Sequence, residues 1–110
     1  MAGASTSMSI GNSQLPQFNE KNYDYWEITM RALFASQDWW ELVKDGFEEP
    51  VDENEFNTLT QAEKDLLKRN KMKDSKALFY LYQAVHESVF SRIAATKKSK
   101  EAWDTLQKTY

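Results

Sequence analysis

The sequence contains no cysteine among its 110 residues, and only three glycines, two prolines and one histidine. The missing cysteine excludes a disulfide scaffold, thiolate zinc sites, iron–sulfur clusters and a cysteine nucleophile. Three glycines, at positions 3, 11 and 46, cannot supply a phosphate-binding loop or a dinucleotide-binding fingerprint. Since no apolar run approaches the roughly 20 residues of a membrane-spanning helix, we expect a soluble protein with no membrane partner. The absence of cysteine and of a signal peptide favours a reducing, cytoplasmic location.

Groups that could perform chemistry are equally scarce. The single histidine, His86, lies between two predicted helices, and no serine or cysteine is positioned in the sequence to form a recognisable triad with it. The acidic stretch 52–55 lacks the glycine and the terminal glutamate of a calcium loop, and zinc would need a second histidine. The sequence therefore predicts a protein that is not an enzyme, with no catalytic residue, no metal site and no cofactor.

Aromatic and charged side chains dominate what is present. Aromatic residues make up 14% of the chain and include four tryptophans, while 41% of all residues are apolar. A chain of this length can bury a core without a disulfide or metal staple. We therefore expect one compact domain over 14–110, preceded by a disordered N-terminal arm over 1–13, because that stretch holds too little apolar surface to offset the entropy of ordering.

The spacing of apolar residues predicts an all-α fold, a single bundle of about five helices with no strand. We expect four of these helices over 23–36, 39–45, 61–84 and 100–110. The remaining one is a short helix that follows Glu87, carries the apolar residues of 89–94 and ends near Thr96. The segment 47–58 is acidic with isolated apolar residues and is predicted to be a loop. Helix-terminal residues are expected at Asn22, Asp38, Thr60 with Glu63, Gly46 and Ser99.

Tryptophans and phenylalanines at helical spacing are expected in the core. These are Trp26, Trp39, Phe79, Phe90 and Trp103. Adjacent helix positions point about 100° apart, so Trp39 and Trp40 cannot both be buried on one face. We therefore take Trp40 as a candidate interface anchor.

Charge is distributed unevenly along the chain, whose net charge is −3. The stretch 38–57 holds eight acidic residues and one lysine, whereas 60–85 holds six basic residues and three acidic ones. One interpretation is an acidic loop near a basic helix, within one molecule or between two copies, and the other is two separately solvated surfaces. Candidate interface residues in the basic stretch are Lys68, Arg69, Lys71 and Lys73. Asp74 interrupts this stretch and no aromatics are interleaved with it, so RNA contact is predicted to be weak or indirect.

Two stretches resemble the Gag polyprotein of copia-type LTR retrotransposons. The first follows the pattern L-x-x-F/L-[DN]-G-x-N-Y-x-x-W-x-x-x-M, then a helix with Trp and a Gly, and matches at Leu15, Phe18, Asn19, Asn22, Tyr23, Trp26, Met30, Leu42, Val43 and Gly46. The second resembles A-K-E-A-W-D-x-L-x-x-x-Y and matches at Glu101, Ala102, Trp103, Asp104, Leu106 and Tyr110. Glu20 stands where the family often has glycine, so we expect a different turn before the first helix.

The resemblance implies the N-terminal lobe of a Gag capsid region, which in the family self-assembles into virus-like particles around element RNA. The family's zinc knuckle and second capsid lobe would lie downstream, and the helix that ends uncapped at Tyr110 leads us to expect a longer natural chain. Self-assembly through weak, repeated contacts between copies is the favoured function. The alternative is a domesticated or truncated Gag-like adaptor that binds a partner peptide in an apolar groove. An enzyme would require His86 inside a cleft.

Overall fold

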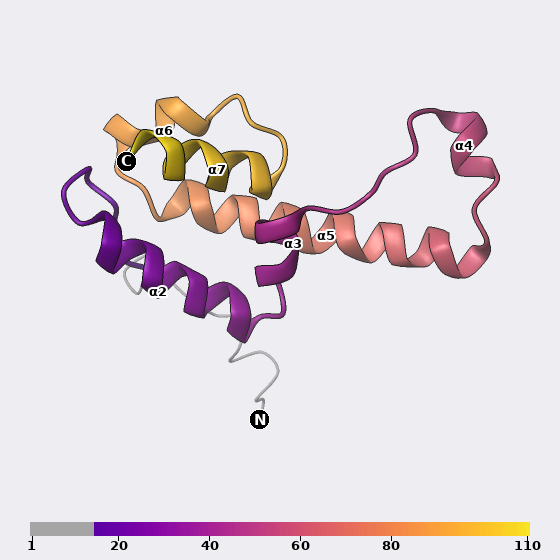
Figure 1. Ribbon diagram of the computed structural model, residues 1–110, viewed down its shortest axis with the longest axis horizontal. Coiled ribbons are helices and arrows are strands. Elements are labelled where there is room, and N and C mark those ends of the chain that lie inside the picture. Colours follow the sequence, from indigo (N-terminus) through magenta and orange to yellow (C-terminus); the bar gives the residue numbers. More distant parts are fainter. Residues whose placement is uncertain (1–14) are drawn as a thin grey trace.

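The computed structural model describes residues 15–110, in which all regular structure is helical (Figure 1). The predicted all-α class is therefore confirmed, whereas the expected disordered arm, 1–13, lies outside the described residues, as does residue 14. The helices are α2 (Tyr23–Ser36), α3 (Trp40–Asp45), α4 (Glu53–Asn57), α5 (Gln61–Gln83), α6 (Glu87–Ile93) and α7 (Ser99–Thr109). Within this range the structure has six helices, one more than predicted.

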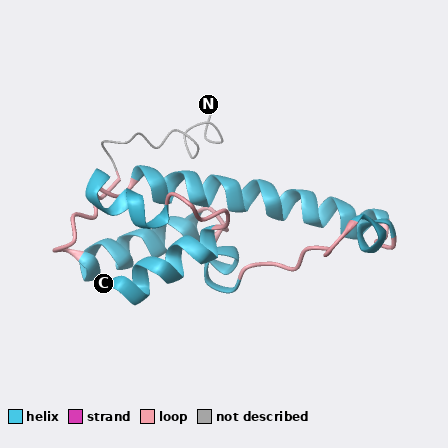
Figure 2. Cartoon of the chain, turned by 90° about the horizontal axis from the view of Figure 1, so that it is seen from above, coloured by secondary structure: helices cyan, strands magenta, loops and turns pink. Residues whose placement is uncertain are grey.

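The long helix α5 is the central element of the fold. In Figure 1, α2 lies along one side of the C-terminal half of α5, and α6 and α7 lie along the other. Helix α7 packs against α3, α5 and α6, and α3 also contacts α2 and α5. The N-terminal half of α5 extends past this bundle together with α4, as the view from above shows (Figure 2). From here on, the arm means this projection, residues 48–72, and not the N-terminal residues 1–13.

Stacked aromatic rings form the centre of the bundle. Trp26 of α2 stacks on Trp103 of α7 with ring centroids 5.7 Å apart, and Phe34 meets the same Trp103 ring edge-on at 6.0 Å. Trp39 stacks on Tyr80 of α5 at 5.5 Å. Aromatic pairs of this kind stabilise by about 0.5–1.5 kcal/mol beyond the apolar area they bury. Aromatic residues from α2, α5 and α7, together with Trp39, thus meet in one core.

The segment before α2 is fixed to the end of α5 by backbone hydrogen bonds. The Phe18 N–H donates to the Ala84 carbonyl and the His86 N–H donates to the Phe18 carbonyl, each at 2.9 Å. The Trp26 indole N–H donates to the same Ala84 carbonyl, also at 2.9 Å. Glu20 adopts a φ of 78°, the left-handed conformation that glycine takes most easily. That this turn differs from the family's stays a prediction, because testing it requires the same turn in another family member.

Two predicted helix ends are confirmed. Thr60 and Glu63 form the full capping box, in which the Glu63 N–H donates to Thr60 Oγ1 at 3.1 Å and the Thr60 N–H donates to Glu63 Oε1 at 2.8 Å. Gly46 follows α3 with a φ of 74°. Both helix ends could be predicted from the sequence because each residue contacts a partner no more than four residues away.

Three other predicted caps act differently. The prediction that Asp38 caps α3 is wrong. Asp38 lies in the turn after α2 with a φ of 64°, and Trp39 takes the N-cap position of α3. Asn22 occupies the N-cap position of α2, but its amide binds the turn before the helix, donating to the Gln17 carbonyl. Ser99 is the first residue of α7 and not its cap, because its N–H donates to the distant carboxylate of Asp74.

The loop prediction for 47–58 is wrong over α4. Asp52, in extended conformation, is the N-cap that precedes this helix, and its carboxylate accepts the Glu55 N–H at 2.8 Å. The core prediction is wrong for Phe79 and Phe90, which are 55% and 39% exposed. Ala77 and Leu81 are the α5 residues fully buried in the core, and the 3.6-residue period turns Phe79 outward.

Candidate interaction surface

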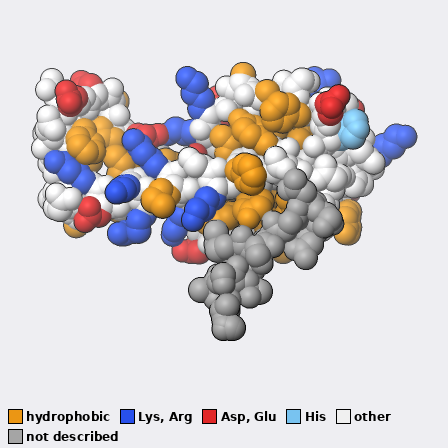
Figure 3. Space-filling model, turned by 180° about the vertical axis from the view of Figure 1, so that it is seen from behind, with side chains coloured by type: hydrophobic (Ala, Val, Ile, Leu, Met, Phe, Trp, Pro, Cys, Tyr) orange, Lys and Arg blue, Asp and Glu red, His pale blue; other side chains and the backbone are white. Residues whose placement is uncertain are grey.

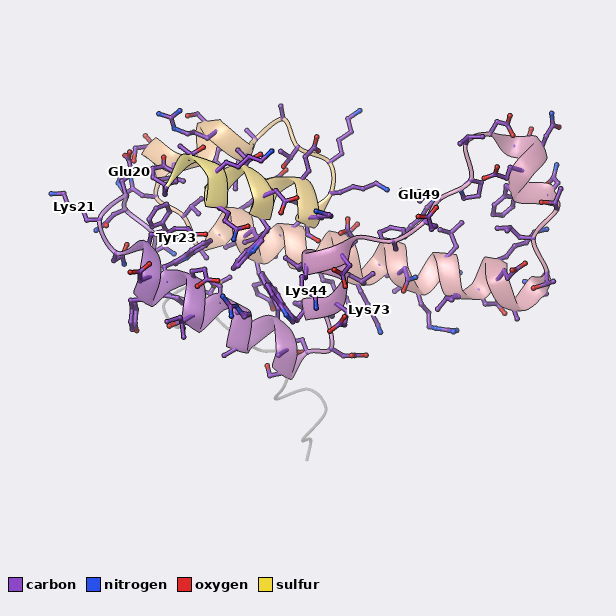
Figure 4. All side chains as sticks on the ribbon, viewed as in Figure 1. Glu20, Lys21, Tyr23, Lys44, Glu49 and Lys73 are labelled. Carbon is purple, nitrogen blue, oxygen red and sulfur yellow. The ribbon has the colours of Figure 1, made fainter. Side chains whose placement is uncertain are left out.

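Ion pairs connect the segments on either side of α3 to α5 and to the residue before α7. The Glu49 carboxylate lies 3.6 Å from the Lys71 ammonium and also binds Lys98, which leads into α7. The hydrogen bond from Lys98 is the largest influence that holds the pKa of Glu49 below its ordinary value. Lys73 of α5 pairs at 3.1 Å with Asp38, which precedes α3; Figure 4 shows Glu49 on the segment that follows α3 and Lys73 beside α3. The acidic loop thus lies near the basic helix within one molecule, which is the intramolecular arrangement that the charge distribution predicts.

A groove of about 790 Å³ runs along the arm between α4 and one side of α5. Its apolar lining consists of Phe56, Leu67 and Met72, of which Leu67 is buried. The basic residues along it are Lys64, Lys68, Lys71 and Lys76, and Asp65 is the one acidic residue. The Lys64 ammonium lies 5.0 Å from the centre of the Phe56 ring. Figure 3 shows this combination, apolar patches bordered by lysines, on the arm.

The other side of the arm is acidic. A smaller hollow of about 290 Å³ lies between the segment before α4 and α5, and its charged lining residues are Glu48, Glu49, Glu55 and Glu63. No basic residue lines it. Its apolar residues include Leu59 and Leu66, and the Leu66 side chain is 50% exposed. The two sides of the arm therefore carry opposite charge, and each includes apolar surface.

The five predicted interface residues do not form one cluster. Lys68 and Lys71 line the groove, whereas Arg69 is exposed outside it and Lys73 is paired with Asp38. Trp40 packs against the core, with its ring edge-on to Trp103 at 5.4 Å. Trp40 is partly buried, and the Arg31 guanidinium lies 5.4 Å from the centre of its ring, so its role as an interface anchor stays a prediction.

The residues of the family motifs lie in the bundle and its turns. The buried ones are Leu15, Phe18, Trp26, Met30, Leu42, Val43, Ala102, Trp103 and Leu106. Tyr23 and Tyr110 are partly buried, and both rings meet Phe18 edge-on, at 5.5 and 4.7 Å. Burial is the main influence that raises the pKa of Tyr23. Asn22 and Gly46 occupy turns at the start of α2 and the end of α3. None of these residues lines the groove of the arm.

His86 acts as a helix cap. It is exposed and precedes α6, where its Nδ1 accepts the Ser88 N–H at 3.1 Å. The Ser88 hydroxyl donates to Glu20 at 3.1 Å. In a catalytic triad the imidazole lies between the serine and the carboxylate. Here Ser88 lies between His86 and Glu20, so the three side chains are not in the order of a triad. In residues 15–110, no group of three or more His, Asp or Glu side chains is placed to hold a metal ion.

Several residues of this surface were not recognised in the sequence. Phe56, Leu66 and Met72 form the apolar parts of the arm, and the presence of Phe56 alone among acidic residues was the available signal. In the sequence, the only visible property of Asp74 is that it interrupts the basic stretch. It is buried, and its Oδ1 accepts the Ser99 N–H at 3.1 Å and the Ser99 hydroxyl at 2.5 Å. Asp74 therefore caps α7 from α5.

Comparison with known proteins agrees with the motif resemblance. Among the described residues, no helix is both long enough and apolar enough to cross a membrane. Searches of curated proteins and of solved structures find no match. The family model described as gag-polypeptide of LTR copia-type matches residues 30–110, a range that contains the second motif and α3 to α7. Since this range covers most of the chain, the protein belongs to the copia-type LTR retrotransposon gag-polypeptide family.

Proposed function

We propose that this chain is a non-catalytic self-assembly domain of a Gag capsid, which forms virus-like particles around element RNA in the cytoplasm. Membership of the gag-polypeptide family supports a Gag-related structural role. A shell subunit needs a rigid body and repeated weak contacts, because multivalency multiplies contacts that are individually weak. The aromatic core supplies the rigid body, and the outer faces of the helices supply the contacts.

The observation that carries this proposal is the number of large apolar side chains outside the core. The exposed ones are Tyr25, Ile28, Val51, Phe56, Leu66, Met72, Phe79 and Phe90. They are distributed over α2, the arm, α5 and α6, so more than one face of the domain offers apolar contact. Exposed apolar side chains distributed over several faces suit weak contacts with several neighbours better than one tight dimer interface.

RNA has an indirect role in the proposal. The net charge of −3 does not favour binding through phosphate neutralisation alone, and two lysines near the arm are already paired with carboxylates. We expect RNA to be enclosed by the assembled shell and held weakly, if at all, by this domain.

Sedimentation velocity tests the proposal directly. The 110-residue chain should sediment as a monomer near about 5 µM and show reversible, weak association as its concentration approaches about 1 mM. Strict monomer behaviour over the whole range would contradict self-assembly. A tight oligomer at micromolar concentration that resists salt would contradict the proposal of weak, repeated contacts.

The groove of the arm favours a second function, that of a Gag-like adaptor for a partner peptide. Its apolar floor and lysine border suit an acidic amphipathic helix, which would place apolar side chains on Phe56 and Met72. Fluorescence anisotropy with a labelled acidic amphipathic peptide tests this function. Saturable binding that a Met72→Glu substitution abolishes, in a chain that shows no self-association, would favour the adaptor over the shell domain.

A further inference from the structure

The two charged sides of the arm are built on opposite sides of one helix. The groove residues Lys64, Lys68 and Lys71 recur along α5 at intervals of three and four residues, which places them on one side. Glu63, Leu66 and Asn70, which line the acidic hollow, recur at the same intervals on the other side. The arm therefore presents a basic groove in one direction and an acidic surface in the other.

Charges remain unpaired on both sides. Lys71 is neutralised by Glu49, but among residues 15–110 no carboxylate lies within ion-pair distance of Lys68 or Lys76. On the acidic side Glu48 likewise has no basic partner in that range. Each side thus lacks the charge that the other side offers.

We propose that the acidic side of the arm of one copy docks into the basic groove of a second copy. This inference rests on the proposed self-assembly function and names the contact that produces it. Leu66, half exposed on the acidic side, would rest on the Phe56 and Met72 floor, while Glu48 would meet Lys68 and Lys76. Because the two surfaces differ, the contact is head to tail, and it repeats into a ring or an open chain.

A second copy matches the groove better than RNA does. Phosphates would use the lysines but leave the apolar floor uncovered, and the one aromatic ring in the groove, Phe56, is already contacted by the Lys64 ammonium. The acidic side of the arm supplies carboxylates and exposed leucine together. It is also present at the same concentration as the groove, since both belong to one chain.

Charge-reversal variants of the 110-residue chain test this contact by sedimentation equilibrium. The groove variant is Lys68→Glu with Lys76→Glu, and the acidic-side variant is Glu48→Lys with Leu66→Lys; all four side chains are exposed. The matched control is Lys21→Glu with Lys108→Glu, exposed residues away from the arm that change the net charge as the groove variant does. Far-ultraviolet circular dichroism of each variant checks that the helices are retained.

We expect each arm variant alone to associate at least about tenfold more weakly than the wild-type chain, and the control to differ less than about threefold. An equimolar mixture of the two arm variants should regain association, because the unchanged acidic side of one variant still fits the unchanged groove of the other. Salt should weaken the wild-type association, because exposed charges are screened.

Other outcomes would overturn the inference in distinguishable ways. If the wild-type chain associates but both arm variants associate equally well, the head-to-tail contact is wrong and the proposed function stands. If the wild-type chain stays monomeric, both are wrong. If the groove variant loses only affinity for a single-stranded homopolymeric RNA, while its self-association is unchanged, the groove is an RNA surface.

Discussion

Removal of the Asp74 carboxylate should destabilise the domain more than any other single change to a charged side chain in the basic stretch. Asp74 is 5% exposed and accepts two hydrogen bonds from Ser99, at 3.1 and 2.5 Å. A hydrogen bond to a charged group contributes about 1.5–3 kcal/mol, and an orphaned buried donor costs a similar amount. Because Asp74→Ala also leaves the first N–H of α7 without its cap, we expect a loss of about 3 kcal/mol in the free energy of unfolding.

The contribution can be separated by a double-mutant cycle with Ser99→Ala. The single Ser99 change removes only the hydroxyl bond and should cost about 1–2 kcal/mol, with a coupling energy between the two positions above about 0.5 kcal/mol. Urea unfolding followed by tryptophan fluorescence measures these values, since all four tryptophans pack in or against the core. Asp65→Ala, an exposed carboxylate on the same helix, is the control. If Asp74→Ala costs no more than the Asp65 control, the cap between helices does not stabilise the fold.

Three further changes test the energetics around the bundle. Glu49→Gln should cost about 0.5 kcal/mol at pH 7 in urea unfolding. The pKa of Glu49 in the folded state lies below its ordinary value of 4.5, so this stability is present above pH 4.5 and is lost as the pH falls through the folded pKa. If the free energies of unfolding of the wild-type and Glu49→Gln chains differ at pH 3 as much as at pH 7, this reasoning is contradicted. Tyr110→Phe should stabilise or leave unchanged the melting temperature, because the Tyr110 hydroxyl is buried with no hydrogen-bond partner among the described residues, and a fall of several degrees would refute this. Gly46→Ala should cost about 1 kcal/mol, since φ is 74° and an added Cβ would lie 3.1 Å from Lys100 Cδ; an unchanged urea midpoint would refute it.

The helices that carry the core could be predicted because their signals are local. The apolar period over 23–36 and the Thr60 capping box each act within a few residues, and both are found in the structure. Phe79 was misjudged because spacing along a helix of 23 residues does not reveal which side meets the bundle. Helix α4 was missed because five residues are too short to show a period.

The interaction surface could be predicted only in its charge. The opposite charge of the two segments indicated that they meet, and the Glu49 contacts with Lys71 and Lys98 bear this out. The groove itself requires Phe56 of α4 to face Met72 of α5, and this placement depends on how the chain turns between the two helices. The role of Asp74 depends on a partner 25 residues further along the chain, which no local pattern shows.

The central claim, that the outer surfaces of this domain and not a reactive centre carry its function, is tested most directly by a dilution series of amide nitrogen–hydrogen NMR spectra. As the protein concentration rises, the account predicts progressive shifts of signals from Glu48, Leu66, Lys68 and Met72, while signals from the core around Trp26 remain fixed. An absence of concentration-dependent shifts on the arm, or shifts confined to the surroundings of His86, would contradict it.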